Sequence, residues 1–291
     1  MDHKLERKKI KTSYQSLVID IFIWVFLIFA ALFILAPTIF MFTASLMPAS
    51  DVVKMPYRWI PGGFYWQNYW QGIRGNDGSF IYIRNILNSL IVATVVSVST
   101  VFLSALAGFG LAKYYFKGRA LVFMMIMGTM MIPFEAIMIP LYLVTTKLGL
   151  QDSYAGLIAP FLVNAFGVFL MRQYFITFPD EILDAARIDG ASELMIFKTI
   201  ILPNSVPAIA TLAILTFKAQ WDNLLWPLLV VQSEEMKTIP LYIVKFMAEK
   251  HTDEGAMMAV AAIASIPILI VFFRLSKYFL GGAALYSSRK G

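Results

Sequence analysis

The chain has 291 residues, of which 59% are hydrophobic and only 14% are charged. An ordinary soluble domain has about 25% charged residues, and a chain with a mean hydropathy of +0.72 has too few polar side chains to cover a water-exposed surface. The composition excludes a disordered chain and disfavours a soluble fold. There is no cysteine, and the only histidines are His3 and His251, so thiolate chemistry is excluded and a histidine-based metal site is not expected. The net charge of +6 fits cytoplasmic loops beside anionic lipid better than nucleic-acid binding.

Six apolar stretches are each long enough to cross a bilayer, which takes about 20 mostly apolar residues. They are apolar on all sides rather than along one stripe, as is typical of helices embedded in lipid. The second stretch carries Ser104, Gly108 and Ala112 at four-residue spacing, which allows two helix backbones to pack closely. The sequence therefore predicts an all-α membrane protein. The expected spans are residues 17–46, 83–112, 120–144, 153–176, 203–231 and 256–280.

Lysine and arginine are distributed unequally between the segments that connect these spans. Fifteen lie on the side that carries both ends of the chain, and eight lie on the other side, spread over longer loops. Because cytoplasmic loops carry the excess of basic residues, both termini are expected in the cytoplasm. The expected organisation is a cytoplasmic segment 1–16, a six-helix transmembrane domain 17–280 with an outer loop 232–255, and a cytoplasmic tail 281–291.

The cytoplasmic link 177–203 is patterned like a pair of short helices rather than a loop. Pro179 suits the first turn of a helix, and two carboxylates follow it, at the end where negative charge is favourable. Gly190 can adopt the left-handed conformation that ends a helix. A second short helix is expected at about 192–201, before Pro203 begins the fifth span.

The first of these short helices is expected to dock on another protein. Its apolar face needs a cover, because helices of this length are marginal in water. That face consists of Ile182, Leu183, Ala185 and Ala186. The link has two cations against five carboxylates, so anionic lipid would repel it; a helix lying on the lipid surface is the alternative. The carboxylates are Asp180, Glu181, Asp184, Asp189 and Glu193, and the cations are Arg187 and Lys198.

The same link resembles the EAA motif of bacterial ABC-importer permeases. The matching residues are, in order, Asp184-Ala185-Ala186, Gly190, Ile200 and Leu202-Pro203, and the one departure is aspartate in place of the usual first glutamate. The resemblance implies that this segment is a coupling helix, which docks in a cleft of a separate ATP-binding subunit. The residues to which it assigns coupling are Asp184, Ala185, Ala186, Asp189, Gly190, Leu202 and Pro203.

Further stretches from the first span to the sixth are similar to the maltose-transporter-type permeases of carbohydrate ABC importers. They are Asn88-Ser89-Leu90, Met131-Ile132-Pro133, Ile139-Pro140-Leu141-Tyr142, Leu148-Gly149-Leu150, Ile188-Asp189-Gly190-Ala191-Ser192 and Trp221-Asp222-Asn223-Leu224-Leu225-Trp226-Pro227-Leu228. The last stretch departs from the usual Trp-Asn order. The resemblance implies a type I importer permease fold in the bacterial inner membrane. It also implies the partners of a binding-protein-dependent sugar importer: a sister permease, two subunits that bind ATP and magnesium, and an extracytoplasmic solute-binding protein that touches the outer loop.

Polar and ionisable residues gather in the fifth span, where such groups usually have a function. Lys218 and Asp222 share a helix face and can neutralise each other, so a structural ion pair and a polar wall of the translocation cavity are both open interpretations. Trp221 and Trp226 either offer a flat face to a sugar ring or anchor the chain at the interface. In the third span, Glu135 lies between two prolines, and it either lines the cavity or hydrogen-bonds freed backbone. The candidate cavity residues are Glu135, Lys218, Gln220, Trp221, Asp222, Asn223 and Trp226.

Several catalytic motifs are missing from the chain. It contains no G-x-x-x-x-G-K-[ST] loop, H-E-x-x-H or G-x-S-x-G motif, so we expect a transport subunit that is not an enzyme and binds no cofactor or metal of its own. An ion-coupled secondary carrier is one alternative, although no symmetry between the halves of the chain supports it. A permease for another solute, such as glycerol phosphate, a polyol or an amino acid, is the other, because the sequence does not identify the cargo.

Overall fold

The structure is a computed structural model, which describes residues 2–75, 78–248 and 253–288. Every regular element in these ranges is a helix, as the sequence predicted. The chain divides into two compact units, Met1–Gln71 with Asp253–Ala262 and Gly72–Thr252 with Ile263–Gly291. The last helix, α15 (Glu254–Ser288), contributes to both units and continues beyond the expected end of the sixth span at residue 280.

The first unit contains α1 (Asp2–Ala44), α2 (Ala49–Val52) and the beginnings of α3 (Gln67–Arg74) and α15. Its small core forms where α1 ends, around Ala44, Met47 and Val52. The buried Asn68 side chain donates hydrogen bonds to the carbonyls of Ser45 (2.9 Å) and Met47 (2.7 Å), which fixes the turn after α1. None of the apolar window within Leu17–Ala44 is buried inside the chain, so this helix requires lipid or another protein as its cover.

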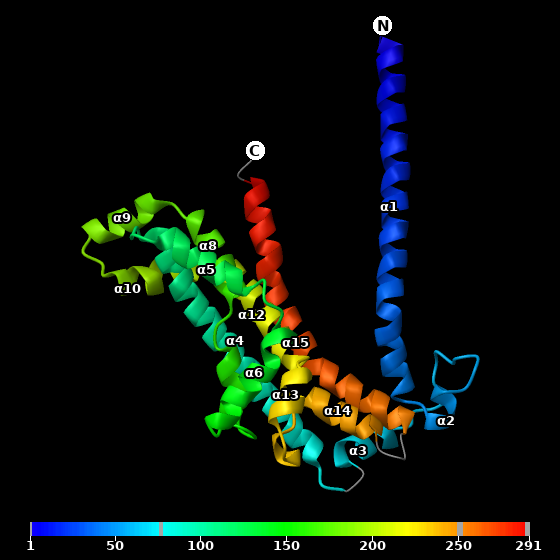
Figure 1. Cartoon of the computed structure of the whole chain (residues 1–291). Helices are drawn as coiled ribbons and strands as arrows, with labels where there is room; N and C mark the ends of the chain where they lie inside the picture. Colours follow the sequence, from blue (N-terminus) through cyan, green and yellow to red (C-terminus); the bar gives the residue numbers. More distant parts are fainter. Residues whose placement is uncertain (1, 76–77, 249–252, 289–291) are drawn as a thin grey trace. The chain divides into compact units, whose positions relative to one another are not determined.

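The second unit is built on α4 (Ile81–Lys113), which packs along α8 (Ala165–Ile176) and α12 (Val206–Trp221). Figure 1 shows these three helices side by side, with α6 (Phe134–Lys147) and α13 (Leu225–Val230) toward one end of α4. At Gly108 an added Cβ would lie 2.8 Å from the backbone nitrogen of Arg172. The close approach expected from the small residues of the second span is therefore confirmed, with α8 as the partner.

Three of the six expected spans are not single continuous helices. Three helices are individually long and apolar enough to cross a membrane, or up to six spans exist if each sharply bent helix pair is one span. The bend between α5 (Arg119–Thr129) and α6 is 93°. The segment formed by α7 (Tyr154–Ile158) and η1 (Ala159–Phe161) is bent by 44° relative to α8. The segment Glu193–Asn204 is bent by 78° relative to α12. The expected span 120–144 is not one continuous helix, because Pro133 lacks the N–H that a helix interior needs and instead precedes α6.

The fifth span also differs from its prediction. Its long helix α12 begins at Val206 rather than at Pro203, and Asp222 ends it before α13 begins at Leu225. The expected helix over 203–231 is therefore divided into α11 (Leu202–Asn204), α12 and α13. The prolines at 203 and 207 cause the first interruption, since neither can donate a helical hydrogen bond.

The outer loop 232–255 is anchored on α4 rather than being only a solvated turn. It contains η3 (Glu234–Met236) and α14 (Ile239–Ala248). Asn88 donates to the carbonyls of Glu235 (2.7 Å) and Lys237 (2.9 Å), and the Ser89 hydroxyl accepts from the backbone N–H of Ile239 (2.8 Å). Residues 249–252 of this loop, which include His251, lie outside the described residues, and so do residues 289–291 of the expected tail.

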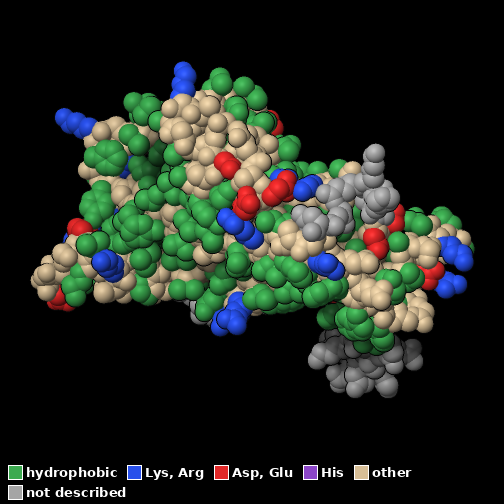
Figure 2. Space-filling model, turned by 90° about the horizontal axis from the view of Figure 1, so that it is seen from below, with side chains coloured by type: hydrophobic (Ala, Val, Ile, Leu, Met, Phe, Trp, Pro, Cys, Tyr) green, Lys and Arg blue, Asp and Glu red, His purple; other side chains and the backbone are tan. Residues whose placement is uncertain are grey.

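Much of the surface is apolar, as expected for a chain embedded in lipid. Hydrophobic side chains cover large areas of the face in Figure 2, and lysine, arginine and carboxylate side chains are scattered between them. On α4, Val98 is 64% exposed and Phe102 is 50% exposed. An exposed apolar surface of this kind is unfavourable in water and favourable against lipid or a second membrane protein.

Candidate functional site

The candidate site is the pair of short helices after α8, which we call the elbow (residues 180–204). It contains α9 (Asp180–Ile188), α10 (Glu193–Ile196), the π-helical turn η2 (Phe197–Ile201) and α11. Pro179 precedes α9 at its N-cap position. Gly190 has φ +82°, the left-handed conformation expected from the sequence, so the chain turns there between α9 and α10. The Ser192 hydroxyl then accepts from the N–H of Met195 (3.3 Å) and caps α10.

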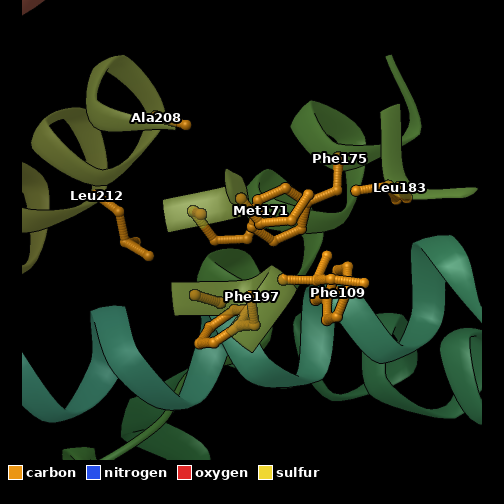
Figure 3. Close-up of a cluster of buried hydrophobic side chains, with 10 residues drawn as sticks. Phe109, Met171, Phe175, Leu183, Phe197, Ala208 and Leu212 are labelled. Carbon is orange, nitrogen blue, oxygen red and sulfur yellow. The ribbon is translucent and has the colours of Figure 1, made fainter. Parts of the chain in front are cut away.

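The inner side of the elbow is part of the largest core described in the second unit. Leu183, the buried residue of α9, is 1% exposed and packs with Phe109 of α4 and Phe175 of α8. Figure 3 shows these three side chains gathered with Phe197 of η2. The ring centroids of Phe109 and Phe197 are 5.5 Å apart. A fully buried leucine or phenylalanine contributes about 1.5–3 kcal/mol, so this side of the elbow is fixed to α4.

The outer side of the elbow carries apolar side chains that nothing in the described chain covers. Ile188 is 87% exposed, Leu194 57% and Met195 55%, and Ile182 and Ala185 are also exposed. The sequence prediction of a single docking face was therefore partly wrong. Leu183 points into the chain's own core, and Ala186 is half-buried beside it, because adjacent residues on a helix point in different directions.

An ion-pair network holds α9 to α10. Arg187 donates to Asp184 (2.7 Å) and to both carboxylate oxygens of Glu193 (2.8 and 3.3 Å). Hydrogen bonds to Glu193 and Asp184 hold the pKa of Arg187 above its usual range. The Tyr114 hydroxyl donates to Glu193 (2.5 Å), and burial together with this bond raises the pKa of Tyr114 to about 12. Tyr114 therefore stays a neutral donor at physiological pH and ties the end of α4 to the elbow.

Lys113 adds a second tie, which the sequence did not reveal. Its ammonium donates to the Phe178 carbonyl (2.5 Å) and to Asp180 (2.6 Å), and the lysine side chain is only 4% exposed. In the sequence Lys113 is one of several basic residues after the second span. Its position as the last residue of α4 is the only signal that could have indicated a contact, since basic side chains often bind carbonyls near helix ends.

The remaining coupling candidates take three different positions. Asp184 and Asp189 are exposed, and only Asp184 forms an ion pair within the described chain. Leu202 is half-buried against the elbow core, whereas Pro203 is exposed. Pro203 follows η2, where the N–H of Leu202 bonds to the Phe197 carbonyl in the wider π-helical pattern. The proline thus shapes the backbone of the elbow.

The polar residues of the fifth span form a second candidate site. Lys218 and Asp222 form an ion pair of 2.8 Å, with side chains that are 63% and 55% exposed. Asn223 donates weakly to Gln220 (3.4 Å) and accepts from the backbone N–H of Trp226 (3.3 Å) at the start of α13. The pairing expected from the spacing of Lys218 and Asp222 is thus observed, and it presents neutralised charge on the surface of this chain.

The two tryptophans do not offer the free ring faces expected from the sequence. Trp221 is 3% exposed, stacks on Phe217 and donates to the Ala264 carbonyl (3.1 Å). Trp226 is fully buried and donates to the Gly156 carbonyl (2.9 Å). Each indole is a core residue of the described chain, since it is buried and its N–H is satisfied.

The position of Glu135 does not support one of its two expected roles, a hydrogen bond to freed backbone, and the other, lining the cavity, stays a prediction. It lies in the first turn of α6, directly after the 93° bend, and its side chain is exposed. Within the described residues its carboxylate makes no hydrogen bond to the backbone freed by the prolines. Negative charge is favourable at a helix N-terminus, which accounts for its position without assigning it a role. The described residues also contain no group of three or more acidic or histidine side chains that would hold a metal ion.

Comparison with known proteins identifies the family. Residues 100–281, which include the elbow and the polar residues of α12, match the family described as "Binding-protein-dependent transport system inner membrane component". The chain belongs to this family. As a permease it is a transport subunit of the inner membrane and not an enzyme, and it works with ATPase and other partner components.

Two relatives and one solved structure resemble the permease over nearly its whole length. It is 35% identical over 275 residues to the arabinooligosaccharides transport system permease protein AraQ of Bacillus subtilis (strain 168), covering 94% of this chain and 97% of the relative. It is 33% identical over 261 residues to the sn-glycerol-3-phosphate transport system permease protein UgpE of Brucella abortus (strain 2308), covering 88% and 93%. A chain in the crystal structure of a bacterial ABC transporter involved in the import of the acidic polysaccharide alginate aligns with a TM-score of 0.79 and 25% identity, covering 90% of the permease and 96% of that chain.

Proposed function

We propose that the permease forms half of the translocation pathway of an ATP-driven sugar importer and is coupled to its ATPase through the elbow. The observation that carries the proposal is the two-sided construction of the elbow. Its inner side is fixed to α4 through Leu183, whereas its outer side exposes Ile188 and neighbouring apolar side chains. A partner that grips the outer side would move the transmembrane helices with it.

The proposed assembly has three kinds of component besides this chain. A sister permease supplies the other half of the pathway, two ATP-binding subunits supply energy, and an extracytoplasmic binding protein delivers the cargo. ATP and magnesium bind the ATPase subunits, since the permease has no phosphate-binding loop of its own. Both termini face the cytoplasm, as the distribution of basic residues favours, and the outer loop 232–255 faces the binding protein.

The proposed mechanism is a two-state movement of a rigid element. Closure of the ATPase subunits shifts the elbow, and α4 follows because Lys113 and Tyr114 bond to Asp180 and Glu193. Coupling of this kind needs an element with two alternative conformations. ATP and the loaded binding protein must each bind one of these conformations more tightly than the other. The proposed contacts to the ATPase come from Asp184, Ala185 and Asp189 on the exposed side of the elbow.

The proposed cargo is a sugar. The named relatives transport arabinooligosaccharides and sn-glycerol-3-phosphate, and the solved structure imports alginate. A phosphate ester would favour an uncompensated cation on the pathway, whereas Lys218 is neutralised by Asp222. We therefore place Lys218, Gln220, Asp222 and Asn223 on the pathway as neutral hydrogen-bonding groups.

The coupling role is tested by charging the exposed side of the elbow. Ile188→Glu should abolish substrate uptake by the complete complex in vesicles, because a charge would be buried against the ATPase. Ile60→Glu is a matched control, since Ile60 is 82% exposed and lies in the segment expected on the outer side. Uptake by Ile188→Glu equal to that by Ile60→Glu would exclude coupling through this face.

The cargo is tested separately with the same wild-type vesicles. Labelled oligosaccharide and labelled sn-glycerol-3-phosphate are offered in parallel with the system's own binding protein, whose ligand is first measured by calorimetry. Uptake of the sugar and not of the phosphate ester is the expected result. The reverse preference would overturn the sugar assignment and leave the coupling role intact.

A further inference from the structure

Two arginines from different helices meet close to the end of α4. Arg119 begins α5, and Arg172 lies one turn before the end of α8. Arg172 packs over the ring of Phe123, which lies one helical turn after Arg119 in α5, so both guanidinium groups lie at the junction of α4, α5 and α8. Figure 1 shows α5 and α8 side by side near the elbow. Both side chains are half-buried, so the pair is a local concentration of positive charge held in place by the fold.

Each guanidinium is held by groups that carry no negative charge. Arg119 donates to the Tyr114 carbonyl (3.2 Å) and lies 4.6 Å from the centroid of the Tyr115 ring. Arg172 donates to the Leu111 carbonyl (3.2 Å) and lies 4.0 Å from the centroid of the Phe123 ring. Cation–π contacts and carbonyl bonds orient an arginine without neutralising it.

In the described part of the chain neither arginine has a carboxylate partner. Five other basic residues of the second unit do have one: Lys113, Arg187, Lys218, Lys237 and Lys245. A guanidinium has five N–H donors, and one bond from each arginine accounts for only part of them. Two like charges at one junction of helices, with donors left over, are complementary to an anion that accepts several hydrogen bonds.

The position of the pair in the chain indicates which anion is available. The link between α4 and α5 also carries Lys117 and connects two spans on the expected cytoplasmic side. Arg172 is four residues, about 6 Å along the helix axis, from the end of α8. It therefore lies near the end of the expected fourth span, where phospholipid headgroups are expected. Beside the pair, α5 exposes Leu121, Met124 and Met125, which are 57%, 60% and 58% exposed and would lie against acyl chains.

We propose that Arg119 and Arg172 form a binding site for the phosphate headgroup of an anionic phospholipid. The guanidinium groups chelate the phosphodiester oxygens, as arginine does elsewhere with phosphate, and the exposed side of α5 receives an acyl chain. Arg172 also bonds to one of the last carbonyls of α4. The bound lipid therefore contacts the junction of α4, α5 and α8 directly beside the elbow. The site depends on the membrane location of the permease and not on its cargo.

The test measures lipid retained by the complete complex. Complexes are incorporated into vesicles of phosphatidylcholine with increasing phosphatidylglycerol, extracted, washed, and their bound lipid counted by mass spectrometry. The double variant Arg119→Gln/Arg172→Gln should need about thirtyfold more phosphatidylglycerol than the wild type for equal retention, since each basic residue near the membrane surface contributes about fivefold. The control Lys198→Gln/Arg274→Gln removes the same charge from two exposed cytoplasmic-side positions and should behave like the wild type.

A second variant keeps the test valid if the double variant fails to assemble. Arg119→Gln alone leaves the contact of Arg172 with Leu111 intact, and it should reduce retention about fivefold. Equal retention by this variant and the control would overturn the proposal. Displacement of the lipid by inorganic phosphate would instead identify a site for free phosphate. Crosslinking from Arg119→Cys to an ATPase subunit, and not to lipid, would identify a protein contact; either result would overturn the lipid assignment.

Discussion

Asp152 illustrates how much one side chain can organise outside the membrane-spanning helices. Its carboxylate accepts from the backbone N–H groups of Gln232 (2.9 Å) and Ser233 (3.0 Å), and so joins the loop before α7 to the outer loop. Its φ of 52° is left-handed, which aspartate and asparagine tolerate better than other side chains. Burial raises the pKa of Asp152, but the backbone N–H groups of Ser233 and Gln232 outweigh this, and the net pKa is lowered.

The pH dependence of this contact follows from the lowered pKa. A carboxylate with a depressed pKa stabilises the fold above its unfolded-state pKa of about 3.9 and loses this contribution as pH falls through the folded-state value. Asp152→Asn keeps an acceptor and tolerates the left-handed backbone, so its deficit relative to the wild type should be present at neutral pH and vanish in acid. Asp152→Ala should cost about 2 kcal/mol at neutral pH, because it adds backbone strain to the lost bonds. Thermal unfolding of the purified complex from neutral to acidic pH measures both; a deficit of Asp152→Asn that grows in acid would contradict the assignment.

Single residues were predictable from the sequence where the reason was local. The Lys218–Asp222 pair follows from helical spacing, and the left-handed Gly190 follows from the end of a helical pattern. The burial of Trp226 was not predictable, because it depends on Phe134 and Phe161, which are distant in the chain and pack edge-on against its ring. Lys113 was missed for the same reason, since Asp180 is 67 residues away.

At the scale of elements, α4 and α8 pack closely because Gly108 has no side chain at their contact. An added Cβ at Gly108 would lie 2.8 Å from the Arg172 nitrogen and 2.9 Å from the Met171 Cβ, so the two helices would have to separate. Gly110, two residues further along α4, has nothing within 4 Å of its added Cβ. The two positions therefore form a matched pair within one helix.

Alanine substitution at these two glycines should change stability in opposite directions. Gly108→Ala should destabilise the permease by about 1–3 kcal/mol through overpacking. Gly110→Ala should be neutral or stabilise it by up to about 1 kcal/mol, because alanine is the better helix former. Denaturant unfolding of the purified complex measures the difference. Equal stability of the two variants would show that the helices do not pack at Gly108.

The elements themselves were predictable only as far as hydrophobic periodicity reaches. The expected span 83–112 lies within one helix, α4, because no proline interrupts it. The stretch around Pro133 was expected to continue, since proline is tolerated in membrane helices, yet the chain bends there by 93°. A change of helix was expected at Pro203, and a bend of 78° lies close to it, between Asn204 and Val206. Whether neighbouring helices satisfy the freed carbonyls is a tertiary property, and it decides between a kink and a break.

At the scale of the whole molecule, the expected orientation of the permease rests on the distribution of charge alone. Ile60 lies in the segment expected outside, and Tyr115 and Ile188 lie in links expected inside. All three side chains are highly exposed, at 82%, 87% and 87%. Because the chain has no cysteine, a single cysteine at each position reports its location without background.

Thiol labelling of these variants should distinguish the two sides of the membrane. A membrane-impermeant reagent added to intact spheroplasts should label Ile60→Cys and leave Tyr115→Cys and Ile188→Cys unmodified until the cells are permeabilised, because a charged reagent cannot cross the hydrocarbon core. Labelling after denaturation shows that each cysteine is reactive. The opposite pattern would place the elbow outside, away from any ATPase, and would remove the basis of both the coupling role and the cytoplasmic lipid site. The expected pattern places the exposed side of the elbow in the compartment that contains ATP, where the proposed partner must act.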